Sequence, residues 1–522
     1  MTNSGRRLWL ASGIIALALL PGALVAWRFR DMPQFGAFHD DGIYWVSAQS
    51  IAQRGEYRIP SLPGAPSQTK YPPLYPLFLA PVWALNSRFP ANLPIAALLT
   101  WLWLPVFAFL SWKFFLSLNL GEWQSALLAS VAVLLPQTLL HANRLMSDIM
   151  FACLLLVSLR LLAAAGGHGL WRGVAAGLAY LTRTAAAPLL LVVPVWLLCQ
   201  RRYRAAAAFL AGALPFLAGW HLWCAAHRSA SSDEVTIYYT DYLRYQLAGF
   251  SGTSILERIA NNFGYLLSAI ARLLAVDSSG SFLEIAAQRV MVAAAIAGIV
   301  RLGRSGRAVP YALFAALYTC QVLVWRFEPN PRFLFCLLPL LLAGLWVELA
   351  RVGRLVRSSL RHPPAANRVV AALFLAVLLW MAWLFARQAR WEYARIGPAM
   401  LRQQRGMMAR TSAVYDWIAT HVAPGAVFFA INDPALYLYT GRHALRCADL
   451  NDIFARDRSG RLRPTERLLR FVEAQKVSHV LVTANDFETP AGQGLKLALE
   501  GTNWVPLFED GWSFVCKTSA HP

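Results

Sequence analysis

Residues 330–361 read NPRFLFCLLPLLLAGLWVELARVGRLVRSSLR, and this stretch carries the pattern that decides the fold. From Phe333 to Ala350 the only charged side chain is that of Glu348, so the run can span the hydrocarbon core of a membrane as a helix. Arginines follow at once, and clusters of basic residues mark the cytoplasmic end of a span. The stretch therefore predicts a transmembrane helix whose external end lies beside Arg332.

The same apolar pattern recurs along most of the chain. Of its 522 residues 57% are hydrophobic and only 14% are charged, whereas soluble domains have about 25% charged residues. The sequence thus predicts an all-α polytopic membrane protein with about eleven transmembrane helices. We place these spans at about residues 8–27, 95–114, 122–141, 148–164, 171–183, 184–200, 205–224, 283–301, 309–325, 333–350 and 368–386.

The formal net charge of +21 comes from 48 basic and 27 acidic residues, and its distribution follows the predicted topology. All basic clusters fall on one side of the membrane if the N-terminus is cytoplasmic, as the positive-inside rule requires. The clusters are Arg6-Arg7, Lys113, Arg172, Arg201-Arg202-Arg204, Arg301/Arg304/Arg307 and Arg351/Arg354/Arg357/Arg361. The charge therefore does not indicate a nucleic-acid partner.

This topology divides the chain into a membrane domain over 1–386 and an external domain over 387–522. Two long external loops, 28–94 and 225–282, interrupt the membrane domain. In the first loop, helical spacing of apolar residues from Tyr44 to Gly55 predicts an amphipathic helix suited to the membrane interface. The proline-rich run YPPLYPLFLAPVWAL that follows predicts a second interfacial helix.

The external domain has a different composition. AVFFAI, HVLVTA and WSFVCKT are short β-rich runs, whereas TSAVYDWIATHV and TERLLRFVEAQK have helical spacing, so a small α/β domain is predicted. Two of the seven cysteines, Cys447 and Cys516, fall here, either as a disulfide or as two free thiols. The group HLWCAAH (His221, Cys224, His227) offers three potential metal ligands, although a structural role is the favoured interpretation.

Two adjacent carboxylates, Asp40 and Asp41, stand in FHDDGIYWVSAQSIAQRGEY (38–57), directly before the first amphipathic helix. In a structural interpretation, Asp40 caps this helix and Asp41 lies in its first turn, where negative charge is favourable. In a functional interpretation, the pair supplies a base or a metal-binding carboxylate at the boundary between water and membrane. The two interpretations are compatible, because a cap also fixes the position of the carboxylate.

Four motifs in order resemble the GT-C glycosyltransferases, integral membrane enzymes that use sugars linked to polyprenyl phosphate. They are DDGIY with KYPPLYP (70–76), RLMSD (144–148), GLAYLTR (177–183) and NPRFLFCLLPLLL (330–342). The spacing Asp-Asp-x-x-Tyr in DDGIY is similar to that of the lipid A aminoarabinose transferases and, more loosely, the protein O-mannosyltransferases. The resemblance implies a GT-C membrane domain that transfers a single sugar from undecaprenyl phosphate to an acceptor on the periplasmic side, with inversion.

The resemblance also implies roles for particular residues. The base is Asp40, Asp41 would orient it or bind a basic partner, and Asp148 would support the acceptor or a cation. Arg183 is costly to bury between two apolar runs, which fits a cavity-facing cation. The implied donor-phosphate ligands are Lys70, Arg183 and Arg332, and the side chains that could flank the sugar are His39 and Tyr44.

The sequence contains no Gly-rich nucleotide loop, so a nucleotide-sugar donor is not indicated. It also lacks the W-W-D signature of oligosaccharyltransferases, which argues against transfer of a preassembled glycan to Asn. No cofactor is required; a divalent metal at Asp40, Asp41 and Asp148 is left open. The expected partners are the lipid-linked donor, a lipid, glycan or protein acceptor, and the bilayer of a bacterial inner membrane. The alternatives are a flippase or transporter of a lipid-linked sugar, and a non-catalytic scaffold.

Overall fold

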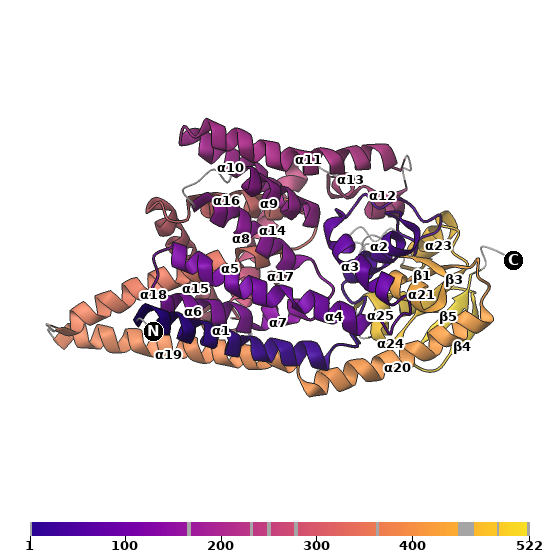
Figure 1. Cartoon of the computed structure of the whole chain (residues 1–522). Coiled ribbons are helices and arrows are strands. Elements are labelled where there is room, and N and C mark those ends of the chain that lie inside the picture. The colour runs from indigo at the N-terminus through magenta and orange to yellow at the C-terminus, as the bar shows by residue number, and fades with distance from the viewer. Residues whose placement is uncertain are drawn as a thin grey trace. The chain divides into compact units, whose positions relative to one another are not determined.

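The computed structural model describes residues 3–163, 169–229, 233–247, 252–275, 280–361, 365–446, 464–487 and 490–518. Most of these residues are helical, as predicted, and the strands are confined to the last part of the chain (Figure 1). The chain divides into two compact units. Unit 1 comprises Met1–Arg28, Leu98–His221 and Gln246–Gly397, and unit 2 comprises Phe29–Ala97, Leu222–Tyr245 and Pro398–Pro522.

Unit 1 consists of helices, most of them apolar. Its elements are α1 (Asn3–Arg28), α5 (Trp103–Ser117), α6 (Glu122–Leu134), α7 (Pro136–Ala142), α8 (Asp148–Ala163), α9 (Gly169–Thr182), η1 (Thr184–Ala186), α10 (Ala187–Cys199), α14 (Gly252–Leu273), α15 (Phe282–Arg304), α16 (Val309–Leu323), α17 (Pro331–Leu334), η2 (Phe335–Leu337), α18 (Leu338–Arg361) and α19 (Ala365–Ala394). Three helices include residues of both units: α4 (Leu93–Trp101), α11 (Tyr203–His227) and α13 (Tyr242–Leu247).

Each predicted span coincides with a helix or a pair of helices, so the chain is a multi-pass membrane protein. Among the described residues, five helical segments are long and apolar enough to cross a membrane by themselves. A sixth is added if α6 and α7, which meet at an angle of 61°, form one broken span. The predicted number of about eleven is therefore not confirmed, because several apolar helices, such as α10 and α16, are short.

Glycines allow two of these helices to approach closely. A Cβ on Gly298 of α15 would lie 1.9 Å from the carbonyl oxygen of Gly344 on α18, and one on Gly344 would lie 2.3 Å from that of Ala295. Small residues at such crossings are typical of helix packing within membranes, where close contact replaces the hydrophobic effect as the driving force. A side chain at either position would separate α15 from α18.

Unit 2 combines most of the segment predicted to form the first external loop, the short segment Leu222–Tyr245 and the last part of the chain. Its helices are α2 (Asp40–Arg54), α3 (Leu74–Leu85), α12 (Glu234–Thr240), α20 (Pro398–His421), α21 (Asp433–Thr440), α23 (Pro464–Ala474), α24 (Ala484–Phe487) and α25 (Pro490–Glu500). Its strands are β1 (Val427–Ala430), β2 (His443–Leu445), β3 (His479–Val482), β4 (Val505–Glu509) and β5 (Phe514–Lys517).

The predicted helix in the first external loop is present as α2, but it differs from the expected amphipathic helix. Residues 41–48 are buried on all sides, whereas Ile51 and Ala52, expected on the apolar face, are only half-buried. The helix ends at Arg54, and the next residue, Gly55, has a φ of 67° and donates its N–H to the Ile51 carbonyl, a conformation that favours glycine. The location of α2 and α3 at a membrane interface stays a prediction.

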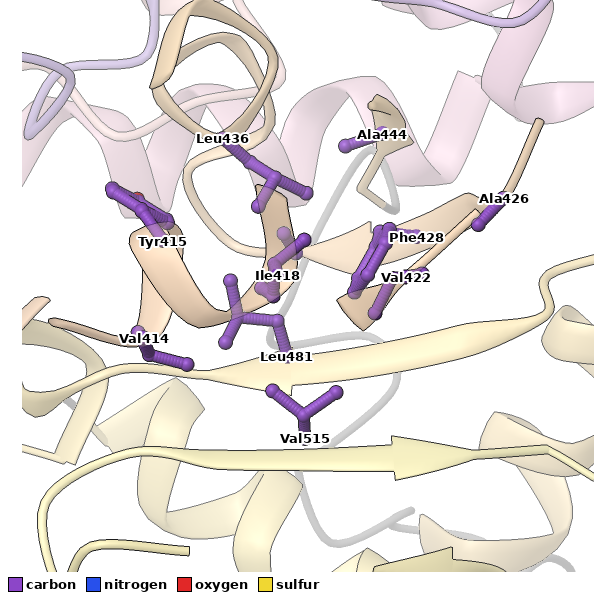
Figure 2. Packing of buried hydrophobic residues seen from close by; sticks show 11 residues of the cluster. Val414, Tyr415, Ile418, Val422, Ala426, Phe428, Leu436, Ala444, Leu481 and Val515 are labelled. Atoms are coloured by element: carbon purple, nitrogen blue, oxygen red, sulfur yellow. The ribbon is translucent and has the colours of Figure 1, made fainter. Parts of the chain in front are cut away.

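The five strands form one mixed sheet in the order β2-β1-β3-β5-β4. β1 pairs in parallel with β2 and β3, whereas β5 is antiparallel to β3 and β4. Figure 2 shows how α20 packs on this sheet, with Ile418 among Phe428, Leu481 and Val515. Burying a side chain of this size stabilises the fold by about 1.5–3 kcal/mol.

The strands expected from AVFFAI, HVLVTA and WSFVCKT are confirmed as β1, β3 and β5, and the two expected helices as parts of α20 and α23. The sequence did not predict β2 or β4. Cys516 is buried in β5, while Cys447 lies outside the described residues, so neither alternative for the two cysteines is tested. The division into domains at residue 386 stays a prediction, since the two compact units follow other boundaries.

Candidate active site

The acidic pair lies at the beginning of α2 in unit 2. The structural interpretation had Asp40 as the cap, but α2 begins at Asp40 itself and His39 is the cap residue, without a capping side-chain bond. Both carboxylates therefore lie in the first helical turn, where the helix dipole stabilises negative charge.

The two carboxylates have different contacts. Asp41 is buried and accepts backbone hydrogen bonds from Gly36 (2.8 Å) and Gly42 (3.0 Å), so it fixes the loop around itself. Asp40 is partly exposed, and its Oδ1 accepts a hydrogen bond from the Tyr71 hydroxyl. Of the pair, Asp40 is the more accessible carboxylate, whereas Asp41 is engaged by the backbone around it; the roles of both residues stay predictions.

Lys70 lies in the same unit, among aromatic rings. Its Nζ is 3.6 Å from the ring centroid of Tyr238, 4.8 Å from that of Tyr242 and 5.0 Å from that of Tyr71. The Gln68 side chain orients this segment by accepting the backbone N–H groups of Lys70 (3.0 Å) and Tyr71 (3.1 Å). Lys70 is buried, so these aromatic rings are the immediate surroundings of its ammonium group, and Tyr71 contacts both Lys70 and the candidate base.

The structure places the two expected sugar-flanking residues in packed surroundings. The Tyr44 ring packs 4.9 Å from that of Tyr71 and 5.0 Å from that of Tyr75. The His39 ring is buried, with its Nε2 2.8 Å from Asp433 Oδ1 and 3.3 Å from the Tyr239 hydroxyl. A sugar-contacting role for either residue stays a prediction.

Burial also decides how the His39–Asp433 pair holds its proton. It raises the pKa of Asp433 to about 7 and, together with the charges of Arg446 and Lys70, holds the pKa of His39 well below 6.5. A neutral imidazole thus faces a carboxyl group that gains its proton near neutral pH. The contact satisfies one buried polar atom of each side chain, while His39 Nδ1 and Asp433 Oδ2 have no hydrogen-bond partner among the described residues.

Three further predicted residues meet in unit 1. Arg183 interrupts the run between α9 and η1 with an extended backbone, and Arg332 follows the Asn330 cap of α17. Arg183 Nη1 lies 2.8 Å from Asp148 Oδ1, and Arg332 Nε lies 3.2 Å from Asp148 Oδ2. Arg183 thus stands between α9 and η1, where the predicted spans 171–183 and 184–200 meet.

This arrangement suits an anion. The two guanidinium groups and one carboxylate sum to a single positive charge, and their side chains are at most 16% exposed. Guanidinium groups match the geometry of phosphate oxygens, and Asp148 holds both in place. Because cations occupy both of its oxygens, Asp148 is a poor candidate for a base.

The described residues contain no group of three or more His, Cys, Asp or Glu side chains that could hold a metal ion. In HLWCAAH, the side chains make other contacts: His221 meets the Tyr180 hydroxyl (3.0 Å), and the Cys224 thiol points to the Thr69 carbonyl (3.6 Å). These contacts agree with the structural interpretation of this segment. Metal dependence stays open.

Sequence reasoning missed Tyr71, Tyr239 and Asp433. Tyr71 stands inside the KYPPLYP motif next to Lys70, so its proximity to the acidic pair was the available signal. Asp433 follows β1, and side chains at the carboxyl ends of parallel strands often form sites. No pattern in the sequence links Asp433 to His39, which lies 394 residues earlier.

Residues 69–329, half of the chain, match the family model of glycosyltransferase family 87. The chain belongs to this family. The matched range contains Lys70, Asp148 and Arg183, but neither Asp40 nor Arg332. None of the curated proteins compared with the chain matches it.

The family 87 protein also shares its fold with solved structures. ArnT from Cupriavidus metallidurans bound to undecaprenyl phosphate superposes with a TM-score of 0.52 at 16% identity, over 98% of this chain and 99% of ArnT. The archaeal oligosaccharyltransferase AglB from Archaeoglobus fulgidus, in complex with an inhibitory peptide and a dolichol-phosphate, gives 0.52 at 12% identity, over 96% and 74%. The Archaeoglobus fulgidus oligosaccharyltransferase in complex with Zn and sulfate gives 0.55 at 14% identity, over 95% and 72%.

The predicted membership of the GT-C superfamily is confirmed by the family match together with these structures. The protein is accordingly a glycosyltransferase of the membrane-embedded type.

Proposed function

We propose that this family 87 protein transfers one sugar from an undecaprenyl-phosphate-linked donor to an acceptor on the periplasmic side of the bacterial inner membrane. The observation that carries the donor class is the pair of arginines on Asp148, a permanently positive site inside a membrane protein. The solved structure of ArnT with undecaprenyl phosphate supports a donor of the same chemical kind.

In the proposed reaction, Asp40 takes the proton of the acceptor hydroxyl while that oxygen attacks the anomeric carbon. The bond from this carbon to the phosphate oxygen breaks, and polyprenyl phosphate leaves with its negative charge. A single displacement inverts the configuration at the sugar carbon. Because a phosphate leaves without being protonated, one carboxylate suffices, in contrast to the two that glycosidases use.

The residues of the two units have separate proposed tasks. Arg183 and Arg332 bind the leaving phosphate, while Asp148 holds their guanidinium groups in place. Tyr71 donates a hydrogen bond to Asp40 and thereby orients its carboxylate, and Lys70 contributes positive charge in the same unit. The sugar, the acceptor and a metal requirement stay open.

The test uses the purified full-length protein in lipid nanodiscs with a panel of undecaprenyl-phosphate sugars and a membrane extract. We expect release of undecaprenyl phosphate together with a glycosylated product, identified by mass spectrometry, whose anomeric configuration is opposite to that of the donor. Release without a glycosylated product would indicate hydrolysis. Neither release nor product, with movement of labelled donor across vesicles, would establish the flippase alternative.

Arginine variants test the phosphate site. Because a hydrogen bond to a charged group contributes about 1.5–3 kcal/mol, Arg332→Ala should raise the KM for the donor about 10- to 100-fold. The matched control is Arg354→Ala, which removes an exposed arginine from α18 and should leave KM unchanged. Equal KM values for both variants would remove Arg332 from the site.

A further inference from the structure

The backbone directly before Asp40 adopts a rare conformation. His39 has φ 62° and ψ −48°, and the Asp40 N–H donates to the Phe38 carbonyl (2.6 Å), which closes a γ-turn with positive φ. A non-glycine residue in this region is strained and persists only when its surroundings hold it. The position of the candidate base therefore depends on whatever holds His39.

Three consecutive residues, 432–434, contact the turn and the residues on both sides of it. The Asn432 side chain donates to the Phe35 carbonyl (3.3 Å) and lies 2.1 Å from where a Cβ on Gly36 would stand. Pro434 lies 2.7 Å from where a Cβ on Gly42 would stand. No room for a side chain remains at either glycine, so the backbone of residues 35–42 lies directly against this segment.

The middle residue, Asp433, makes the central contact. Its Oδ1 lies 2.8 Å from His39 Nε2, and both side chains are buried, Asp433 at 0% and His39 at 4% exposure. The Tyr239 hydroxyl, 3.3 Å from the same imidazole nitrogen, borders the ring from a third segment of the unit. The strained residue is thus buried and held through its Nε2 by contacts from two other segments of the unit.

The position of residues 432–434 beside the sheet explains how they can contact the turn at His39. Residues 432–434 follow the carboxyl end of β1, the strand whose two parallel neighbours, β2 and β3, lie on opposite sides. In open α/β sheets the crevice at such a point usually receives a ligand. Here the first external loop lies against it instead, and the Ala444 N–H of β2 also donates to the Ser61 carbonyl of that loop (2.9 Å).

We propose that Asn432, Asp433 and Pro434 are positioning residues that hold the γ-turn at His39 and thereby fix the carboxylate of Asp40. The His39–Asp433 hydrogen bond is the central link. The sheet of the last part of the chain, for which the sequence indicated no chemistry, is then required for the position of the base. This inference rests on the proposed function only where it calls Asp40 the base.

Amide hydrogen exchange of the intact protein in nanodiscs tests the positioning directly. Asp433→Asn and His39→Gln should each raise exchange in the peptide covering residues 36–45 about tenfold or more, while peptides of β1 and β3 keep their protection. The double variant should exchange no faster than either single variant, because all three lose the same link. The matched control is Asp486→Asn, which removes another buried carboxylate after β3, bonded to Thr483, and should leave residues 36–45 unchanged.

Kinetics provide the second readout. A displaced base should lower kcat about 10- to 100-fold in Asp433→Asn, with a donor KM like that of the wild type, since small displacements at a reacting centre act on turnover. If Asp433→Asn unfolds the sheet, Gly42→Ala decides, because it disturbs the contact with Pro434 and leaves the buried pair intact. Unchanged exchange at 36–45 in these variants would overturn the positioning role.

The exchange measurement separates this inference from the proposed function. A wild-type protein that transfers no sugar from any donor, yet gains exchange at 36–45 in Asp433→Asn, would contradict only the proposed function. Full transfer together with unchanged exchange in the same variant would contradict only the positioning role.

Discussion

The two acidic centres of this molecule contain the same functional group in opposite surroundings. Asp148, in unit 1, is buried and bound on its two oxygens by the guanidinium groups of Arg183 and Arg332. Asp40, in unit 2, is partly exposed and accepts a hydrogen bond from the neutral hydroxyl of Tyr71.

The difference shows that partners, more than residue type, decide what a carboxylate does. Paired with two permanent cations, Asp148 is stabilised as an anion and gives up its capacity to accept a proton. A phenol donor orients Asp40 without neutralising its charge. The comparison therefore supports the proposal in which the first centre binds phosphate and the second transfers a proton.

The largest expected effect sharpens the proton-transfer side of this comparison. Asp40→Asn keeps the size and a hydrogen-bond acceptor but removes the base, so kcat should fall about 10²- to 10⁴-fold. The donor KM and the melting temperature should stay close to the wild-type values. The measurement is steady-state release of undecaprenyl phosphate by the purified variant.

The control for Asp40→Asn is Asp416→Asn, which removes an exposed carboxylate from α20 in the same unit. Wild-type turnover by Asp40→Asn would end the assignment of this residue as the base. It would leave the family membership untouched.

Asp148→Asn tests the binding side and should act mainly on stability. Removing one partner of a buried ionic group costs about 3–5 kcal/mol, because the remaining charges lose their compensation. We therefore expect a clear fall in the melting temperature in detergent, which added undecaprenyl phosphate should partly reverse by supplying an anion to the two arginines. If Asp148→Asn instead lowers kcat at unchanged stability, as expected for Asp40→Asn, the two carboxylates have the same role and the contrast between them is wrong.

Sequence reasoning predicted much of this arrangement because its signals are local. The apolar runs predict the membrane helices, and Arg183 was recognised because a charge between two such runs is costly. Contacts between distant segments carry no such signal. The hydrogen bonds of Asp433 with His39 and of Arg332 with Asp148 join residues far apart in the sequence, so no local pattern predicts them. In the same way, the residues that bury α2 come from other segments, and the apolar pattern of α2 alone does not identify them.

The His39–Asp433 pair predicts opposite pH dependences for its two single variants. In the folded protein the pKa of Asp433 is raised from 3.8 to about 7, so its contribution to stability is present at low pH and lost as the pH rises through about 7. The pKa of His39 is lowered below 6.5, so folding is disfavoured as the pH falls below that value. In the wild type these two contributions change the free energy of unfolding with pH in opposite directions between about pH 4 and 6.5.

Each of the single variants Asp433→Asn and His39→Gln removes one of these two pH-dependent contributions to stability. Asp433→Asn should lose stability as the pH falls below 6.5, because burial and the charges of Arg446 and Lys70 still disfavour the imidazolium. His39→Gln should lose stability as the pH rises from 5 to 7, with a slope of about 1.4 kcal/mol per pH unit at most. The neighbouring phenols of Tyr238 and Tyr239 do not titrate in this range, since burial raises the pKa of both.

Melting temperatures in detergent from pH 5 to 8 measure these slopes. Parallel profiles for Asp433→Asn and His39→Gln would show that the pair does not share a proton as described. Asp486→Asn leaves both members of the pair in place, so their opposing pH dependences should persist. This control removes only the contribution of Asp486 itself, whose pKa burial raises to about 6.

The smallest expected effect concerns the hydrogen bond that distinguishes Asp40 from Asp148. Burial and the nearby charge of Asp40 hold the pKa of Tyr71 well above 10, so its hydroxyl remains a donor at every pH at which the protein would be assayed. Tyr71→Phe removes this donor, and because such a bond contributes about 0.5–1.5 kcal/mol, kcat should fall about 2- to 10-fold. Tyr439→Phe, whose hydroxyl meets only the Met408 sulfur at 4.0 Å among the contacts described for it, is the control. An equal loss in both variants would mean that the phenol supports packing and not the base, and Asp40 would then need another orienting partner.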